Sequence, residues 1–304
     1  LTSTNSSIGL IYALKKIFWK YLFMYDFHFD SKSKIIKNPE SFLLFVKKLL
    51  PRWLNGIPDS ECIAIFRLLQ KRKNIRNVIP IETGCGASTL AFFLHCYLNK
   101  TKFFSWDTNG SKGSYLRNII NESMCLPLGV NVNEIWKFIP YYSTDDYVGI
   151  KILKDLNLKS DFCFFDTSHT LNQLISEIQQ FEIISYKKFC LALDDAYYTK
   201  RGINYTFLNI IRTKLNLRRV KEPKDNICKP FYQEVENYLK KKYKRVIKVN
   251  DYYKPNYKKD NWFRYYKEVK DFGVSDYNKN FTKNDFEKRS KRFRHRFDAF
   301  NISK

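Results

Sequence analysis

Short apolar segments alternate with helical patterns through the middle of the chain. Five segments are short and apolar, as buried strands are: 77–82, 102–106, 136–141, 161–165 and 189–193. Four segments between them are expected to be helical: 88–98, 112–124, 144–156 and 171–184. This alternation predicts a parallel sheet with helices on both faces, which is an α/β fold.

The segments before the first predicted strand read as helices. Residues 1–58 form an expected helical extension, in which Pro51 and Pro58 end segments. Asp59 is a suitable N-cap for a helix over 60–73. The extension packs on the main domain or on a partner, or rests on a membrane through the basic, apolar stretch 8–29.

Beyond the fifth strand the pattern predicts one more helix and two more strands. The helix covers 230–242, and strands at 243–249 and 262–269 would form a closing antiparallel pair. The main domain is therefore expected to span 59–270. The remainder, 271–304, is basic with interspersed phenylalanines and is expected to be a tail.

A glycine-containing turn follows the first predicted strand. Glu82 ends that strand, Gly84 and Gly86 form the turn, and Ser88 opens a helix. Glycines let a backbone approach a ligand closely, a helix start offers unpaired N–H groups, and an acid can pair with a ligand cation. The turn lacks the third glycine of a dinucleotide fingerprint and the lysine of a phosphate-binding loop. A tight turn without any ligand stays an alternative.

Polar residues also follow the second and third strands. Asp107 ends the second strand, where an acid could accept both hydroxyls of a ribose. Ser143, Thr144 and Asp145 follow the third strand and could flank an adenine ring. A helix cap by Ser143 or Thr144 explains this polar stretch equally well.

The segment from about 60 to 200 resembles a class I S-adenosylmethionine-dependent methyltransferase, through Glu82-x-Gly84-x-Gly86-x-Ser88 and Asp107. The resemblance implies a Rossmann-like, doubly wound, mostly parallel seven-stranded sheet. It also implies S-adenosylmethionine as cofactor, with the 143–145 region near the adenine.

Three acids lie at the ends of two further strands. Asp166 ends the fourth strand, and Asp194 and Asp195 end the fifth. Because neighbouring parallel strands end at one rim, these carboxylates would repel each other unless they are protonated or share a cation. All-oxygen ligation favours Mg²⁺, with Ca²⁺ or Mn²⁺ as alternatives. The competing interpretation is one helix cap and two solvated acids.

Asp166-Thr167-Ser168-His169 followed by Asp194-Asp195 is similar to metal-dependent O-methyltransferases of the catechol type and of the bacterial, macrolide-tailoring sugar type. In this resemblance Asp166, Asp194 and Asp195 bind Mg²⁺, and Asp166 and Asp195 belong to the catalytic group. His169 or a nearby carboxylate would take the proton of a hydroxyl that attacks the sulfonium methyl in line. The alternative is that His169 orients a metal-bound Asp or the substrate. Bacterial relatives often have glycine where this chain has Thr167, which is a departure in that loop.

Composition narrows the setting without naming an acceptor. Among 304 residues, 54 Lys and Arg face 30 Asp and Glu, for a net charge of +24. Either an anionic partner or AT-rich codon usage explains this charge. Seven cysteines without a CxxC pair indicate free thiols in a reducing compartment, so we expect a cytoplasmic protein, with contact at the inner membrane face left open. The resemblance to bacterial sugar O-methyltransferases implies a bacterial protein.

The acceptor suggested by the resemblance is a sugar or glycan hydroxyl, and a homo-oligomer stays open. Two other functions remain as alternatives. The basic C-terminal region suits a nucleic-acid methyltransferase, but the sequence after Phe165 lacks the Asn/Asp-Pro-Pro-Tyr pattern of nucleobase amine methylation. The second alternative is a non-catalytic partner subunit with this fold. The complete set of glycines and acids argues against this alternative.

Overall fold

The computed structural model describes residues 31–167, 171–194, 211–212, 214–217, 231–249 and 297–304. These residues form a seven-stranded sheet with the order β3-β2-β1-β4-β5-β7-β6. The strands are β1 (Val78–Thr83), β2 (Phe103–Trp106), β3 (Trp136–Ile139), β4 (Lys159–Phe165), β5 (Ser185–Leu193), β6 (Arg245–Lys248) and β7 (Asp298–Ser303). Strands β1 to β5 are parallel, and β7 runs antiparallel to both of its neighbours, β5 and β6. The predicted Rossmann-like, mostly parallel sheet is confirmed.

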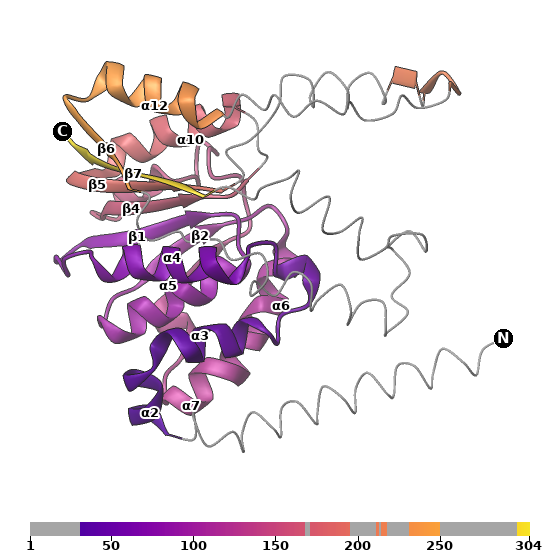
Figure 1. Ribbon diagram of the computed structural model, residues 1–304, viewed down its shortest axis with the longest axis vertical. Helices are drawn as coiled ribbons and strands as arrows, with labels where there is room; N and C mark the ends of the chain where they lie inside the picture. The colour runs from indigo at the N-terminus through magenta and orange to yellow at the C-terminus, as the bar shows by residue number, and fades with distance from the viewer. Residues whose placement is uncertain (1–30, 168–170, 195–210, 213, 218–230, 250–296) are drawn as a thin grey trace.

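Helices cover both faces of this sheet, as Figure 1 shows for α10 and α12 on one side and α3, α4 and α5 on the other. The longer helices are α3 (Pro39–Lys47), α4 (Asp59–Gln70), α5 (Ala87–Leu98), α6 (Gly110–Ile120), α10 (Leu171–Ile184) and α12 (Phe231–Lys242). The shorter ones are α2 (Lys32–Lys37), η1 (Arg52–Leu54), η2 (Asn121–Cys125), α7 (Leu126–Leu128), α8 (Val132–Ile135) and α9 (Ile152–Asp155). One apolar core lies under α3 to α6, and a second lies under α9, α10 and α12.

The strand register brings the carboxyl ends of β1, β2, β4 and β5 to one level. Thr83 pairs with Trp106 on one side and with Phe165 on the other, and Phe165 pairs in turn with Leu193. Each of these residues is the last of its strand. The four residues that follow them are the site candidates Gly84, Asp107, Asp166 and Asp194. These four residues therefore lie along the carboxyl ends of the strands, which we call the rim of the sheet, as the sequence predicts.

The C-terminal end of the chain does not form a tail as predicted. Strand β7 lies within the expected tail 271–304, and it inserts between β5 and β6. Phe300 and Ile302 are buried in the second core and Ala299 in the first, because successive residues of a strand face opposite sides of the sheet. The domain boundary at 270 is therefore wrong. The predicted strand at 262–269 lies outside the described residues.

Two predicted helices are also wrong in extent. The segment expected as a helix over 144–156 is mostly a turn, and only α9 is helical there. At Gly149 an added Cβ would come within 2.3 Å of the carbonyl oxygen of Asp145, so the chain folds back too tightly for a helix. The predicted helix 112–124 begins earlier as α6 and ends in the π-helix η2.

The first described helices belong to the main core. Ile35 of α2 and Phe42 and Val46 of α3 are fully buried in the same cluster as α4 and α5. The part of the expected extension 1–58 that begins at residue 31 therefore packs on the sheet domain. The basic stretch 8–29 lies outside the described residues. No helix in the described part of the chain is both long and apolar enough to cross a membrane.

Candidate functional site

The glycine turn after β1 is shaped by its contact with β4. Gly84 has a φ of 81°, and its N–H donates to the carbonyl of Trp106 at 2.7 Å. A Cβ at this position would lie 1.8 Å from the carbonyl oxygen of Asp166. Glycine is thus required for backbone packing between β1 and β4, a reason that the sequence interpretation, based on ligand approach, did not include.

Glu82 is fully buried and holds the start of α5. Its two carboxylate oxygens accept hydrogen bonds from the hydroxyls of Ser88, at 2.9 Å, and Thr89, at 2.6 Å. The Thr89 hydroxyl also accepts the N–H of Gly86 at 3.0 Å. Burial raises the pKa of Glu82 to about 8, although both hydroxyl hydrogen bonds lower it. Glu82 and Ser88 therefore face each other, and their contact with a cofactor stays a prediction.

Asp107 is fixed at the end of β2 by three donors. One oxygen accepts the N–H of Cys85 at 3.0 Å and the ammonium of Lys112 at 2.9 Å, and the other accepts the N–H of Asn109 at 2.9 Å. Burial by itself would raise the pKa of Asp107, but the hydrogen bonds from Lys112, Asn109 and Cys85 lower it overall. An ionised carboxylate therefore stands directly against the glycine turn. Lys112 is a site residue that the sequence interpretation missed.

The turn after β3 is held from within the protein. Asp145 accepts the N–H groups of Tyr147 at 2.8 Å and of Val148 at 2.9 Å, so it caps this turn. The indole N–H of Trp106 donates to the carbonyl of Val148 at 2.8 Å. Thr144 is half-buried beside them. Asp145 thus holds the turn internally, and an adenine contact by this turn stays a prediction.

Ser143 contacts a buried acid, Glu177, that the sequence interpretation did not include. Its hydroxyl donates to the carboxylate of Glu177 on α10, and the hydroxyl of Thr167 donates to the other oxygen of Glu177 at 2.9 Å. Glu177 is fully buried. A glutamate next to the apolar residues Ile178 and Phe181 on a core-facing helix was the available signal, since such an acid needs buried donors.

Asp166 and Asp194 lie at neighbouring strand ends. The Asp166 N–H donates to the carbonyl of Thr83 at 2.9 Å, and the Asp194 N–H donates to the carbonyl of Phe165 at 3.0 Å. The predicted third ligand, Asp195, and the predicted base, His169, lie outside the described residues. Within the described ranges, no group of three His, Cys, Asp or Glu side chains is arranged to hold a metal ion. The metal site stays a prediction.

The cysteines agree with the predicted free thiols. All six in the described part of the chain are free and buried, and Cys228 lies outside it. Burial raises the pKa of Cys85, in the glycine turn, above its ordinary value, so this thiol stays protonated and is a poor nucleophile.

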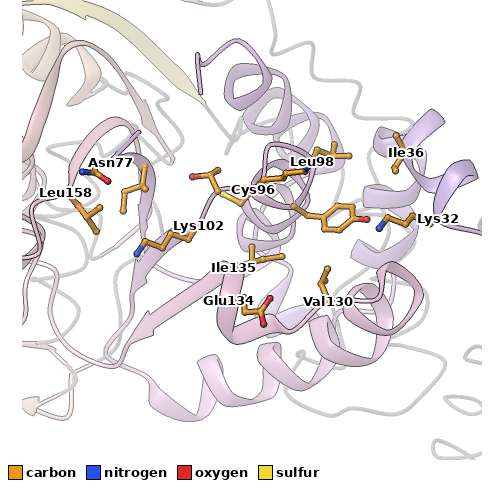
Figure 2. A pocket seen from close by; sticks show the side chains of 14 residues that line it. Lys32, Ile36, Asn77, Cys96, Leu98, Lys102, Val130, Glu134, Ile135 and Leu158 are labelled. Atoms are coloured by element: carbon orange, nitrogen blue, oxygen red, sulfur yellow. The ribbon is translucent and has the colours of Figure 1, made fainter. Parts of the chain in front are cut away.

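A pocket of roughly 760 Å³ lies at the amino ends of the strands, at the opposite end from the rim described above. Its walls include Asn77, Lys102, Ile135 and Leu158, which precede β1 to β4. Figure 2 shows Asn77 and Leu158 at one end of this pocket and Lys32 at the other. Because these residues stand at the amino ends of the strands, the pocket is separate from the rim that carries Asp107 and Asp166.

Comparison with known proteins gives only distant similarities. No protein-family model and no curated protein matches the chain. Among solved structures, the calicheamicin methyltransferase CalS11 has 11% identity and a TM-score of 0.36, over 60% of this chain and 77% of that one. The O-methyltransferase of a trans-AT PKS multienzyme of Brevibacillus brevis, in complex with S-adenosyl-L-homocysteine, has 12% identity and a TM-score of 0.43, over 90% and 80%.

The plantazolicin methyltransferase BpumL in complex with SAH has 11% identity and a TM-score of 0.37, over 98% of both chains. Since the identities are this low and the TM-scores are below 0.5, we base the function on this chain's own residues.

Proposed function

We propose that this chain is an S-adenosylmethionine-dependent O-methyltransferase. The observation that carries the proposal is the hydrogen bond from the Cys85 N–H, in the glycine turn, to the carboxylate of Asp107 at 3.0 Å. This bond joins the two elements that a nucleoside cofactor needs, a close backbone approach and an acid for ribose hydroxyls, at the rim of a doubly wound sheet. The turn has neither the third glycine for a dinucleotide nor the lysine for a triphosphate.

The residues at the rim fit the charge of this cofactor. Asp107 is held ionised and would accept a ribose hydroxyl, and Asp166 and Asp194 begin the same rim. S-adenosylmethionine carries a sulfonium and an ammonium, so acids nearby favour its binding. In the proposal, the methionine part lies along the turn 84–86 and the adenine beside 143–145.

A divalent cation, Mg²⁺ first, is part of the proposal. Asp166 and Asp194 provide carboxylates directly after the register pair Phe165 and Leu193, and Asp195 is the next residue in the chain. Oxygen donors from neighbouring strands suit Mg²⁺. When bound, the cation would lower the pKa of the acceptor hydroxyl. His169 is proposed to take the proton, while Asp107 and the glycine turn orient the methyl group for in-line attack.

The proposed acceptor is a sugar or glycan hydroxyl. Tyr141, Tyr142 and Tyr147 are 54%, 66% and 87% exposed and lie just beyond β3, so their rings offer an aromatic surface beside the rim. The net charge of +24 is compatible with an anionic acceptor such as a phosphorylated glycan. These observations support the acceptor class and leave its identity to experiment.

Calorimetric titration with S-adenosylmethionine and S-adenosylhomocysteine tests the cofactor. Asp107→Asn is expected to weaken binding about tenfold or more, because a charge-assisted hydrogen bond contributes roughly 1.5–3 kcal/mol. Asp146→Asn is the matched control, since the Asp146 side chain is exposed and forms an ion pair with the ammonium of Lys151 at 2.6 Å. Absence of binding by the unmodified protein would overturn the proposed function.

Transfer of a labelled methyl group to glycan fractions tests the acceptor and the metal. We expect a chelator or Asp194→Asn to abolish transfer without abolishing cofactor binding. Transfer that survives both treatments would contradict the metal. Transfer to RNA rather than glycan, with affinity that falls steeply as salt rises, would favour the nucleic-acid alternative.

A further inference from the structure

One buried carboxylate joins two loops of the rim. Glu177 of α10 accepts the Ser143 hydroxyl from the turn after β3 and the Thr167 hydroxyl, at 2.9 Å, from the residue that follows Asp166. Glu177 has no exposed surface, and Ser143 is only 4% exposed. The turn after β3 and the loop after β4 are thus held together through a side chain of a helix in the second core.

The arrangement resists movement of either loop. If Ser143 or Thr167 moved away, the buried carboxyl of Glu177 would lose one of its hydrogen-bond donors, and a lost hydrogen bond to a charged group costs roughly 1.5–3 kcal/mol. Burial raises the pKa of Glu177 to about 7, although the hydrogen bonds from Ser143, Thr167 and Gln173 lower it. Gln173, on α10 itself, also hydrogen-bonds this carboxyl, so Ser143 and Thr167 are the contacts that join it to the two loops.

We propose that Glu177 is a positioning residue, which fixes the adenine-side turn at Ser143 relative to the loop at Thr167 and so preorganises the cofactor site. This inference rests on the proposed function. Glu177 contacts neither the cofactor nor the acceptor in this proposal. It acts because loops that are already ordered do not lose conformational freedom when the ligand binds.

The test uses variants that cut the connection at different points. Glu177→Leu removes both hydrogen bonds, Ser143→Ala and Thr167→Val remove one each, and Glu177→Gln keeps a partner for both hydroxyls. Ser160→Ala is the control, because Ser160 is fully buried and its hydroxyl donates to Phe162 within β4. The full chain is titrated with S-adenosylhomocysteine, and hydrogen exchange of residues 140–149 is measured without ligand.

We expect Ser143→Ala, Thr167→Val and their double variant each to weaken binding by a similar factor, about three- to tenfold, because cutting either end frees the turn. The affinity of Glu177→Gln for S-adenosylhomocysteine should lie within about twofold of that of the unmodified protein. Glu177→Leu should bind more weakly than this. Exchange in 140–149 should rise in every weakened variant and stay unchanged in Ser160→Ala. Retained affinity in the Gln variant separates positioning from a general loss of stability.

Three outcomes overturn the inference. One is unchanged exchange and affinity in the Ser143 and Thr167 variants, and another is fully additive losses in the double variant. The third is loss of affinity in Glu177→Gln equal to that in Glu177→Leu. Binding by the unmodified protein separates the two proposals. If the unmodified protein binds the cofactor and the variants show the same affinity and exchange, the positioning role fails and the proposed function stands. If it binds none, both fail, and the exchange data still report whether Glu177 holds the turn.

Discussion

The ammonium of Lys112 lies 2.9 Å from the Asp107 carboxylate oxygen that also accepts the Cys85 N–H. The other oxygen accepts the N–H of Asn109. A carboxylate offers about four acceptor positions, so little capacity is left for the two hydroxyls of a ribose. Lys112 is the one flexible donor among the three, and it therefore competes with the ribose for Asp107.

Lys112→Met is expected to strengthen binding of S-adenosylmethionine by about three- to tenfold. The substitution frees an acceptor position on Asp107 and removes a cation that repels the sulfonium. Binding of S-adenosylhomocysteine, which lacks the sulfonium charge, should strengthen less. Calorimetric titration measures both, with Lys151→Met as the control at an exposed pair. Weaker binding of both ligands would show that Lys112 assists the cofactor instead.

Gly84→Ala should destabilise the fold far more than Gly129→Ala. Both glycines have positive φ, 81° and 67°, but an added Cβ at Gly129 meets nothing within 4 Å, whereas at Gly84 it meets the Asp166 carbonyl at 1.8 Å. We expect about 1 kcal/mol for Gly129→Ala and at least about 2 kcal/mol more for Gly84→Ala. Urea unfolding checks this, and equal losses would rule out the contact with β4 as the reason for glycine.

Glu82→Gln should flatten the pH dependence of stability. Because burial raises the pKa of Glu82 from 4.5 to about 8, the folded state binds a proton that the unfolded state has released between those pH values. Stability from this proton is complete below pH 4.5 and is lost as pH rises through about 8, at up to ~1.4 kcal/mol per pH unit. The pKa of Glu177 is also raised by burial, so part of the dependence of stability on pH should persist in Glu82→Gln. Urea unfolding across this range gives the slopes, and identical slopes would contradict the prediction.

Two ion pairs join α3 to α4 and should differ in strength. Lys47 and Asp59 are 2.8 Å apart with side chains 2% and 12% exposed, whereas Arg67 and Glu40 are 2.6 Å apart with side chains 47% and 39% exposed. Lys47→Met leaves a buried carboxylate without its cation and should cost ~3 kcal/mol. Arg67→Met should cost less than ~1 kcal/mol, since solvent screens that pair. Thermal and urea unfolding compare the two, and similar losses would contradict the argument from burial.

Phe300→Ala should destabilise the protein by ~3–5 kcal/mol, because Phe300 is fully buried on β7 in the second core. Asn301→Ala, at the next and exposed position of the same strand, should change stability by less than ~1 kcal/mol. Urea unfolding of both variants tests whether the end of the chain is a structural strand. A negligible loss for Phe300→Ala would be inconsistent with β7 in the sheet.

Much of the rim could be predicted because parallel strands are buried on both faces and therefore read as apolar runs. Such runs end at polar residues, so Asp107, Asp166 and Asp194 mark the ends of their strands in the sequence itself. Strand β7, Asp298–Ser303, is not evident in the sequence because it follows a long basic stretch and its apolar residues lie among the polar residues Asp298, Asn301 and Ser303. The turn 144–151 was predicted as helix because its close return at Gly149 depends on contacts that local spacing does not encode.

The sequence by itself determined the five parallel strands β1 to β5 and the positions of the acids at their ends, since both follow from local alternation of apolar and polar residues. Only the tertiary structure decided what those residues contact. Glu82 faces Ser88 and Thr89, Asp107 holds Lys112, and Gly84 is required by the Asp166 carbonyl. These pairings depend on how neighbouring strands align and how helices lie across them, and no local pattern in the chain records those distances.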